Sequence, residues 1–72
     1  MTYEDDARTV ITRLDHARKR AGVSQEECAQ RLRVSFTTLS RWLNGHSVPE
    51  PDNLERVQVL ADELESSENG GQ

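Results

Sequence analysis

The sequence predicts an all-α fold of four helices in a single small domain. Apolar residues recur at intervals of three and four positions in four separate segments, which is the spacing of one helix face. Serine, asparagine and glycine stand where such segments would begin and end, and no segment alternates polar and apolar residues as a half-buried strand would. At 72 residues the chain has room for one core. We therefore expect a binding surface rather than a catalytic cleft.

The first two helices are indicated by their apolar spacing and by their end signals. The first is predicted over residues 4–21, and Gly22 is expected to end it. Its apolar stripe is Ala7, Val10, Ile11, Leu14 and Ala17. The second has Ser24 as N-cap and Glu27 three positions later, as in a capping box. Its core residues are Cys28, Ala29 and Leu32, and residues 33–34 form a tight connection to the next helix.

The third helix is predicted from the N-cap Ser35 to Asn44, with Gly45 as its stop. Rotation by about 100° per residue places three apolar residues on one face, Leu39, Trp42 and Leu43, and we expect this face in the core. The opposite face carries Thr37, Ser40, Arg41 and Asn44. An ordinary solvated face would more often carry Glu and Lys, which favour helices more than Thr and Ser do. The polar face is therefore expected to bind a partner.

The fourth helix follows residues 46–53, "HSVPEPDN", which contain both prolines and are predicted to be a loop. Asp52 or Asn53 is expected to cap this helix. Its apolar stripe is Leu54, Val57, Leu60, Ala61 and Leu64. Val59 lies off the stripe and is a candidate for an apolar contact at a dimer interface, or simply an isolated exposed residue. Residues 66–72, "SSENGGQ", are predicted to be a disordered acidic and glycine-rich tail.

The net charge of -4 hides a separation of charge along the chain. Residues 7–47 hold eight Arg and Lys against three Asp and Glu, a net charge of +5, whereas residues 48–72 hold seven acidic residues and only Arg56. The basic middle can therefore dock on a polyanion although the total is acidic. The single cysteine cannot form an internal disulfide, and no leader or membrane-length apolar run is present. We expect a cytoplasmic protein without a membrane partner.

The segment from Val23 to Gly45, "VSQEECAQRLRVSFTTLSRWLNG", resembles the helix-turn-helix of the phage-repressor and Cro-like group, the XRE family of DNA-binding domains. The shared features are "SQEE.A" at the start of the second helix, "VS..TLSRW.NG" in the third and "P..DNL" after it. The resemblance covers Ile11 to Leu64. It implies a four-helix, helix-turn-helix DNA-binding domain of the lambda-repressor-like type over residues 1–65, with the third helix in the major groove.

The resemblance also implies roles for individual residues. Base contacts are expected from Ser35, Phe36, Thr37, Ser40 and Arg41. Backbone contacts are expected from Gln25, Thr38, Asn44, His46, Ser47 and Arg18. Arg41 is the favoured contact for guanine, because its fork can bind O6 and N7 together. For Phe36, packing against the second helix is the alternative to contact with a thymine methyl group.

Two positions depart from the pattern of this family. Many relatives have glycine at the turn position of Arg33, so Arg33 is expected to adopt a positive φ. Relatives often carry an acidic residue just before "NG", able to pair with a basic residue late in the first helix. This chain has Leu43 at that position, which would leave Arg18 without its partner and free to contact phosphate.

These features predict a small transcriptional regulator that binds double-stranded DNA as a homodimer on a two-fold operator. Half-sites roughly 34 Å apart are the geometric expectation for such a dimer. Repression by occupying the site is the expected mode, with the protein at the nucleoid when it is bound. No enzymatic activity, cofactor or metal is expected, since His16, His46 and Cys28 lack the spacing of a metal-binding set.

Two other functions are consistent with parts of the sequence. An antitoxin-like or adaptor protein could keep this fold and bind a protein partner instead of DNA, and salt-insensitive binding would indicate it. An enzyme that uses Cys28 with His16 would need a reactive thiol, but Cys28 falls on the core-facing side of its helix, where cysteine is usually a small hydrophobic residue. The basic cluster of residues 18–20 fits either a solvated helix end or a phosphate contact.

Overall fold

The computed structural model describes residues 2–70 of the chain, with side chains over residues 2–66. Along these residues the chain forms four helices: α1 (Tyr3–Ala21), α2 (Gln25–Leu32), α3 (Phe36–Leu43) and α4 (Pro51–Gly70). The described residues contain no strand, so the all-α prediction is confirmed. No helix in this part of the chain combines the length and the apolar character that a bilayer crossing needs.

The first three helices begin in the same way, with a hydroxyl side chain that accepts a hydrogen bond from a backbone N–H three residues later. Thr2, Ser24 and Ser35 have extended backbone and act as these N-caps. Their side-chain oxygens lie 3.2, 3.0 and 3.0 Å from the backbone nitrogens of Asp5, Glu27 and Thr38. Because the first N–H groups of a helix have no partner within the helix, these hydroxyls determine where each helix starts. The predicted caps at Ser24 and Ser35 are confirmed.

α1, α2 and α3 also end in the same way, with one residue in the left-handed conformation. These residues are Gly22 (φ 74°), Arg33 (φ 61°) and Gly45 (φ 80°). The N–H of the following residue donates to a carbonyl five positions back: Val23 to Arg18, Val34 to Ala29 and His46 to Arg41. This pairing closes the last helical turn and redirects the chain. The positive φ expected of Arg33 is confirmed, and Arg33 is the one non-glycine residue with this conformation in the described part of the chain.

α4 begins earlier than predicted, because Pro51 occupies its first position. Proline is favourable there, since its fixed φ suits the helix and its missing N–H would have had no helical partner. The carbonyl of Glu50 accepts the backbone N–H of Leu54 at 2.7 Å, so Glu50 lies at the cap position. The prediction that Asp52 or Asn53 caps this helix is therefore wrong, and the predicted loop is too long at its C-terminal end.

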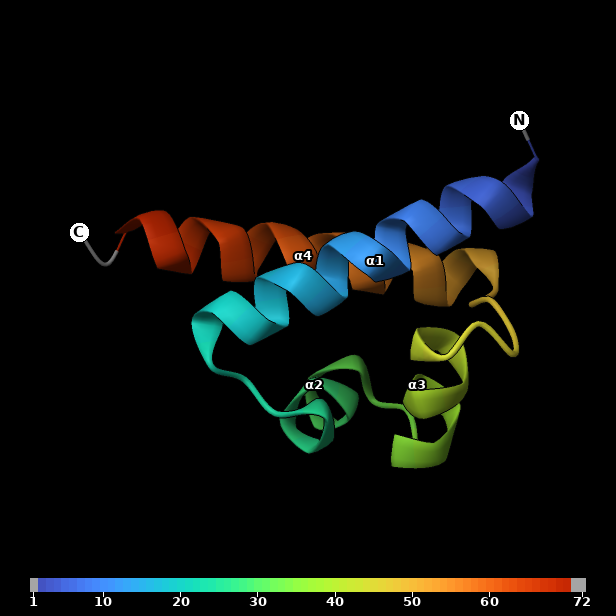
Figure 1. Cartoon of the computed structure of the whole chain (residues 1–72), viewed down its shortest axis with the longest axis horizontal. Coiled ribbons are helices and arrows are strands. Elements are labelled where there is room, and N and C mark those ends of the chain that lie inside the picture. Colours follow the sequence, from blue (N-terminus) through green and yellow to red (C-terminus); the bar gives the residue numbers. More distant parts are fainter. Residues whose placement is uncertain (1, 71–72) are drawn as a thin grey trace.

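The helices form two layers, which Figure 1 shows one above the other. α1 and α4 lie side by side and run in the same direction, while α2 and α3 pack beneath them. The core between the layers takes residues from all four helices: Ile11, Leu14, Ala17, Cys28, Ala29, Leu32, Leu39, Trp42, Val57, Leu60, Ala61 and Leu64. Each predicted apolar stripe therefore faces this core. Trp42 is 6% exposed, which makes it the core anchor that its stripe predicted.

Polar contacts set the position of α4 along α1. The hydroxyl of Tyr3 donates to the carbonyl of Pro49 at 2.6 Å, near the start of both helices. Further along, Arg13 donates through Nε and Nη2 to the two carboxylate oxygens of Glu65, each at 2.9 Å, and also to Asp62. The hydrogen bonds from Arg13 lower the pKa of Glu65. These contacts hold the upper layer together, and the α2–α3 pair packs against that layer.

The predicted tail overlaps the end of α4. The backbone of α4 continues to Gly70, so part of the segment 66–72 belongs to this helix. The side chains of residues 67–70, and residues 71–72 entirely, lie outside the described residues. The division of the chain at residue 65 stays a prediction.

Candidate nucleic-acid interface

The turn between α2 and α3 is short and is held by its own hydrogen bonds. Residues 33–35 make up the connection. The backbone N–H groups of Arg33 and Val34 donate to the carbonyls of Gln30 and Ala29 at 3.1 and 3.0 Å. The side chain of Val34 is half buried against the core. α3 therefore leaves the turn in a fixed direction relative to α2.

α3 presents two faces of different chemistry. Leu39 and Trp42 are buried, and Leu43 is half buried against the core. The outward row consists of Thr37, Ser40, Arg41 and Asn44, of which Ser40 is half buried and the other three are exposed. The amide of Asn44 donates to the Ser40 hydroxyl at 3.2 Å. Because these side chains are open to solvent, α4 does not cover the row.

The start of α3 adds an aromatic ring and two hydroxyl groups to this surface. Phe36 is 52% exposed, so about half of its surface is open to a partner outside the chain. The hydroxyl of Ser35 accepts the backbone N–H of Thr38 at 3.0 Å and donates to the Thr38 hydroxyl at 2.9 Å. The two hydroxyls are thus held together at the first turn.

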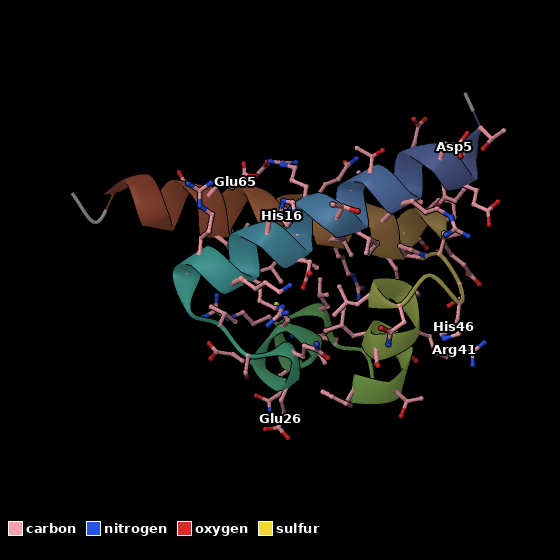
Figure 2. All side chains as sticks on the ribbon, in the orientation of Figure 1. Asp5, His16, Glu26, Arg41, His46 and Glu65 are labelled. Carbon is pink, nitrogen blue, oxygen red and sulfur yellow. The ribbon has the colours of Figure 1, made fainter. Side chains whose placement is uncertain are left out.

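Arg41 differs from most of the basic residues because it makes no ion pair with any of the described residues. Among the cations that do contact a carboxylate within the described part of the chain are Arg8, Arg13, Arg18, Lys19 and Arg31. Arg41 is exposed on α3, and Figure 2 shows its side chain pointing away from the molecule beside His46. The guanidinium group is therefore available to an external partner.

The acidic residues that precede α3 most closely along the chain are Glu26 and Glu27, which are exposed in the first turn of the neighbouring helix α2, where Figure 2 shows Glu26. Figure 2 shows Asp5 and Glu65 along the α1–α4 layer, while Arg41 and His46 lie lower, beyond α3. α3 itself contains no acidic residue. On the part of α4 whose side chains are described, the exposed acidic residues are Asp52, Glu55, Asp62 and Glu63. A polyanion that approaches α3 therefore meets hydroxyl, amide and guanidinium groups, which can all donate hydrogen bonds to it.

A comparison with protein families agrees with this arrangement. Residues 14–64, most of the chain, match the model of a family described as helix-turn-helix. The chain belongs to the helix-turn-helix family. The match confirms the XRE and Cro-like resemblance of the second and third helices, and the chain is a DNA-binding helix-turn-helix domain of the transcription-regulator type. Searches of curated proteins and of solved structures gave no match.

Gln25 is the first residue of α2 in the helix-turn-helix unit, and its side chain is half buried. It directly follows the N-cap Ser24. The free backbone N–H groups and the positive end of the helix dipole favour an anion at this position. A glutamine there can donate a hydrogen bond to phosphate or brace the start of α3.

The turn after α3 lies beside a residue of α1 that sequence reasoning missed. A Cβ atom added at Gly45 would lie 3.4 Å from Nη1 of Arg8. Arg8 also pairs with Glu4 at 3.2 Å, and both side chains are at least half exposed. Arg8 therefore adds a positive charge next to the turn of His46, which is exposed, and Ser47, which is half buried. Local patterns in α1 contain no signal for this contact, because it joins segments that are distant in the sequence.

The prediction that Arg18 lacks a partner is wrong. Its Nη2 and Nε donate to Oδ1 of Asp15 at 2.6 and 3.2 Å, and its Nη1 donates to the carbonyl of Val23 at 3.1 Å. Leu43 does remove the acidic partner found in relatives, but Asp15, one turn earlier on α1, takes its place. Arg18 is 9% exposed and joins α1 to the segment before α2. We therefore leave Arg18 out of the proposed set of phosphate contacts.

Cys28 and His16 show no feature of a catalytic pair. Cys28 is completely buried, and this burial raises the pKa of its thiol. His16 is exposed on α1. The thiolate is the nucleophilic form of cysteine, so a buried thiol with a raised pKa is a poor nucleophile. Cys28 acts as a small residue of the core.

Proposed function

We propose that this helix-turn-helix protein binds duplex DNA with α3 in the major groove and regulates transcription by occupying its site. The observation that carries the proposal is the outward row of polar side chains on α3, which no other helix covers. Within this row, Arg41 makes no ion pair with any of the described residues. Membership of a family of DNA-binding regulators supports DNA as the partner. The major groove is about 12 Å wide and admits a helix, and the short side chains of this row allow close approach to the bases.

Base edges are contacted by the outward side and the start of α3. Arg41 is the guanine contact, because its guanidinium group can donate to O6 and N7 together, for a discrimination of roughly 1–3 kcal/mol. Thr37 and Ser40 each offer a hydroxyl that can donate or accept one hydrogen bond. Ser35 and Phe36 meet the bases at the first turn, where the Phe36 ring packs on a thymine methyl group.

Phosphate contacts surround these base contacts and set the position of α3 in the groove. They are assigned to Gln25, Thr38, Asn44, His46 and Ser47. Arg8, which lies beside Gly45, adds a positive charge at the C-terminal end of α3. Because phosphate contacts carry no direct sequence information, changes at these residues should weaken all DNA sequences alike.

The operator in this proposal is two-fold symmetric and is bound by a homodimer. A helix-turn-helix domain of this type binds one half-site per copy, and the half-sites lie roughly 34 Å apart. A bound dimer that overlaps a promoter would exclude the polymerase, so repression is the proposed outcome.

Selection of bound duplexes from a random pool tests the proposal directly. The expected result is a palindromic consensus with guanine in each half-site. On a duplex with a single half-site, Arg41→Ala should weaken binding by about 5- to 150-fold and remove the preference for that guanine. Arg56→Ala is the matched control, because Arg56 is an exposed arginine on α4. Equal losses in both variants, or an unchanged preference in Arg41→Ala, would overturn the assignment of Arg41.

Salt dependence distinguishes DNA binding from the alternative of a protein-interaction module. The logarithm of the DNA association constant should fall linearly with the logarithm of salt concentration, with a slope of about -0.9 for each neutralised phosphate. Arg8→Ala should reduce that slope by about 0.9 if Arg8 contacts phosphate. A chain that shows no salt-dependent DNA binding, but forms a salt-insensitive complex with a protein, would support the alternative.

A further inference from the structure

Asn44, at the C-terminal end of α3, makes two hydrogen bonds to Ser40, one turn earlier on the helix. Its backbone N–H donates to the Ser40 carbonyl at 2.9 Å, and its side-chain nitrogen Nδ2 donates to the Ser40 hydroxyl at 3.2 Å. The next two residues are held as well, because the N–H groups of Gly45 and His46 donate to carbonyls of α3 at 3.2 and 2.9 Å. The Asn44 side chain therefore extends from a fixed backbone.

The side-chain hydrogen bond determines what the Ser40 hydroxyl can offer to a partner. A hydroxyl group has one hydrogen to donate and can also accept at its oxygen, whereas an amide NH2 group only donates. The Ser40 oxygen is therefore the acceptor in its bond to Asn44, and the hydroxyl hydrogen is left over. This hydrogen has no acceptor among the described residues, since the bond from Asn44 is the one that the Ser40 hydroxyl makes there. Ser40 thus has a donor available on the outward row.

We propose that Asn44 holds the Ser40 hydroxyl as a donor in the complex with DNA, so that Ser40 contacts a hydrogen-bond acceptor in the major groove. The acceptors there are O6 and N7 of guanine, N7 of adenine and O4 of thymine. Cytosine offers its N4 amino group, which is a donor and would face another donor. Ser40 therefore disfavours cytosine at the base that it contacts.

This inference rests on the proposed function for the position of α3 in the groove, and it adds the kind of base atom that Ser40 binds. The second hydrogen of the Asn44 amide group stays available for the phosphate contact assigned to Asn44. One amide group then joins a phosphate oxygen to the Ser40 hydroxyl, and that hydroxyl donates to the base. The low dielectric of an interface without water strengthens such a chain of hydrogen bonds. Asn44 is therefore a positioning residue and, unlike the other assigned phosphate contacts, it also affects sequence preference.

Replacement of Asn44 by aspartate tests the polarity of the Ser40 hydroxyl. The aspartate side chain has nearly the same shape, but as a carboxylate it only accepts hydrogen bonds, so it takes the hydroxyl hydrogen and leaves the acceptor side of Ser40 for DNA. In Asn44→Asp the preference at the base contacted by Ser40 should therefore change from an acceptor to a donor, which is the N4 amino group of cytosine or the N6 amino group of adenine. Asn44 is exposed and has a negative φ of -93°, so the substitution should leave the fold intact.

Selection of bound duplexes from a random pool gives the base preference of each full-length variant. Ser40→Ala identifies the base pair concerned, because preference should be lost at that base pair and kept elsewhere. There the wild-type chain should favour its preferred base over cytosine by about 2- to 12-fold, the range for one neutral hydrogen bond. Asn44→Asp should reverse this ratio. Asn44→Ala should bring it close to one, because the Ser40 hydroxyl then rotates freely.

The double variant Ser40→Ala/Asn44→Asp is the matched control for the added negative charge. It has the charge of Asn44→Asp but no hydroxyl at position 40, so it should show no preference at that base pair. Repulsion between the new carboxylate and phosphate should weaken both variants on all sequences alike. A switch of preference that requires the Ser40 hydroxyl cannot come from a general loss of affinity or of fold.

NMR of the free chain checks the hydrogen bond without DNA. One side-chain amide proton of Asn44 should shift in Ser40→Ala, and circular dichroism should show wild-type helix content in every variant. The inference is overturned if Asn44→Asp keeps the wild-type preference at the Ser40 base pair, if Ser40→Ala changes no preference, or if the Asn44 amide protons do not respond to Ser40→Ala. Any of the first two results on bound DNA would leave the proposed function standing. A wild-type chain that binds no duplex would instead remove the proposed function, and this inference with it.

Discussion

Arg18 and Asp15 form a mostly buried ion pair within one turn of α1, with 2.6 Å between Nη2 and Oδ1. The Arg18 side chain is 11% exposed and the Asp15 side chain 25% exposed. The same guanidinium group donates to the carbonyl of Val23 in the segment that leads into α2. The pair therefore connects the first helix to the helix-turn-helix unit. It also explains how the chain tolerates Leu43 where relatives often have an acidic residue.

Loss of the Asp15 carboxylate should destabilise the fold. Asp15→Ala leaves the guanidinium group of Arg18 nearly buried with one carbonyl as its remaining partner in the structure. Hydrogen bonds to charged groups contribute about 1.5–3 kcal/mol, so we expect the free energy of unfolding to fall by about 2 kcal/mol. Urea unfolding measures the change. Asp6→Ala, at an exposed position of the same helix, is the control and should stay within about 0.5 kcal/mol of wild type. Equal effects of the two changes would show that the ion pair contributes little.

Acid should also destabilise the fold, through two carboxyl groups. Hydrogen bonds from Arg13 lower the pKa of Glu65. Burial by itself would raise the pKa of Asp15, but hydrogen bonds from Arg18 and Lys19 outweigh it and lower that pKa. The folded chain therefore holds these protons less tightly than the unfolded chain. Their contribution to stability is fully present above the ordinary values of 4.5 for Glu and 3.8 for Asp, and it is lost as the pH falls through the lower folded values.

Urea midpoints measured from neutral pH down to about pH 3 should show this loss. Glu65→Gln should be less stable than wild type at neutral pH and should lose less stability on acidification. Asp6→Asn is again the control and should follow the wild-type pH profile, because Asp6 is exposed. A wild-type midpoint that does not change below about pH 4.5 would contradict the prediction.

Arg33→Gly should stabilise the protein. Arg33 ends α2 with φ 61°, a conformation that disfavours a residue with a Cβ by roughly 1–2 kcal/mol. Glycine removes that strain but adds freedom to the unfolded chain, so the net gain should be about 0.5–1 kcal/mol. Arg31→Gly, inside α2 and two residues before Arg33, should instead destabilise by about 1 kcal/mol. Thermal unfolding distinguishes the two variants, and a lower midpoint for Arg33→Gly would mean that the arginine side chain stabilises this turn by other contacts.

The helices and their buried faces could be predicted because their signals act within a few residues. Ser24 and Ser35 begin helices by binding the N–H three positions on, and Gly22 and Gly45 end them by adopting a positive φ. The start of α4 could not be predicted from the same signals. Proline is common both in loops and at the first position of a helix, so Pro51 fits either interpretation.

For the site residues too, features that depend on local spacing could be predicted, and contacts between distant segments could not. The outward position of Arg41 follows from helix periodicity, and the structure leaves this residue exposed. The contact between Arg18 and Asp15 could have been predicted from the sequence, because residues three apart lie next to each other on a helix. It was not predicted because only a partner from the third helix was considered for Arg18. The approach of Arg8 to Gly45 depends on how α1 packs over the turn after α3, and no local pattern contains that information.

Phe36 provides a test of base contact that does not depend on charge. Its ring is 52% exposed at the first turn of α3, where the proposal places a thymine methyl group. Replacing that thymine by uracil deletes one methyl group and should weaken wild-type binding by about fourfold, the equivalent of about 0.8 kcal/mol for a buried methyl or methylene group. Phe36→Ala should bind the thymine duplex more weakly than wild type and should no longer distinguish it from the uracil duplex. Fluorescence anisotropy with four combinations of protein and duplex gives the coupling between ring and methyl group. If Phe36→Ala keeps the full preference for thymine, the ring does not contact that methyl group, and packing of Phe36 against α2 becomes the better explanation of its position.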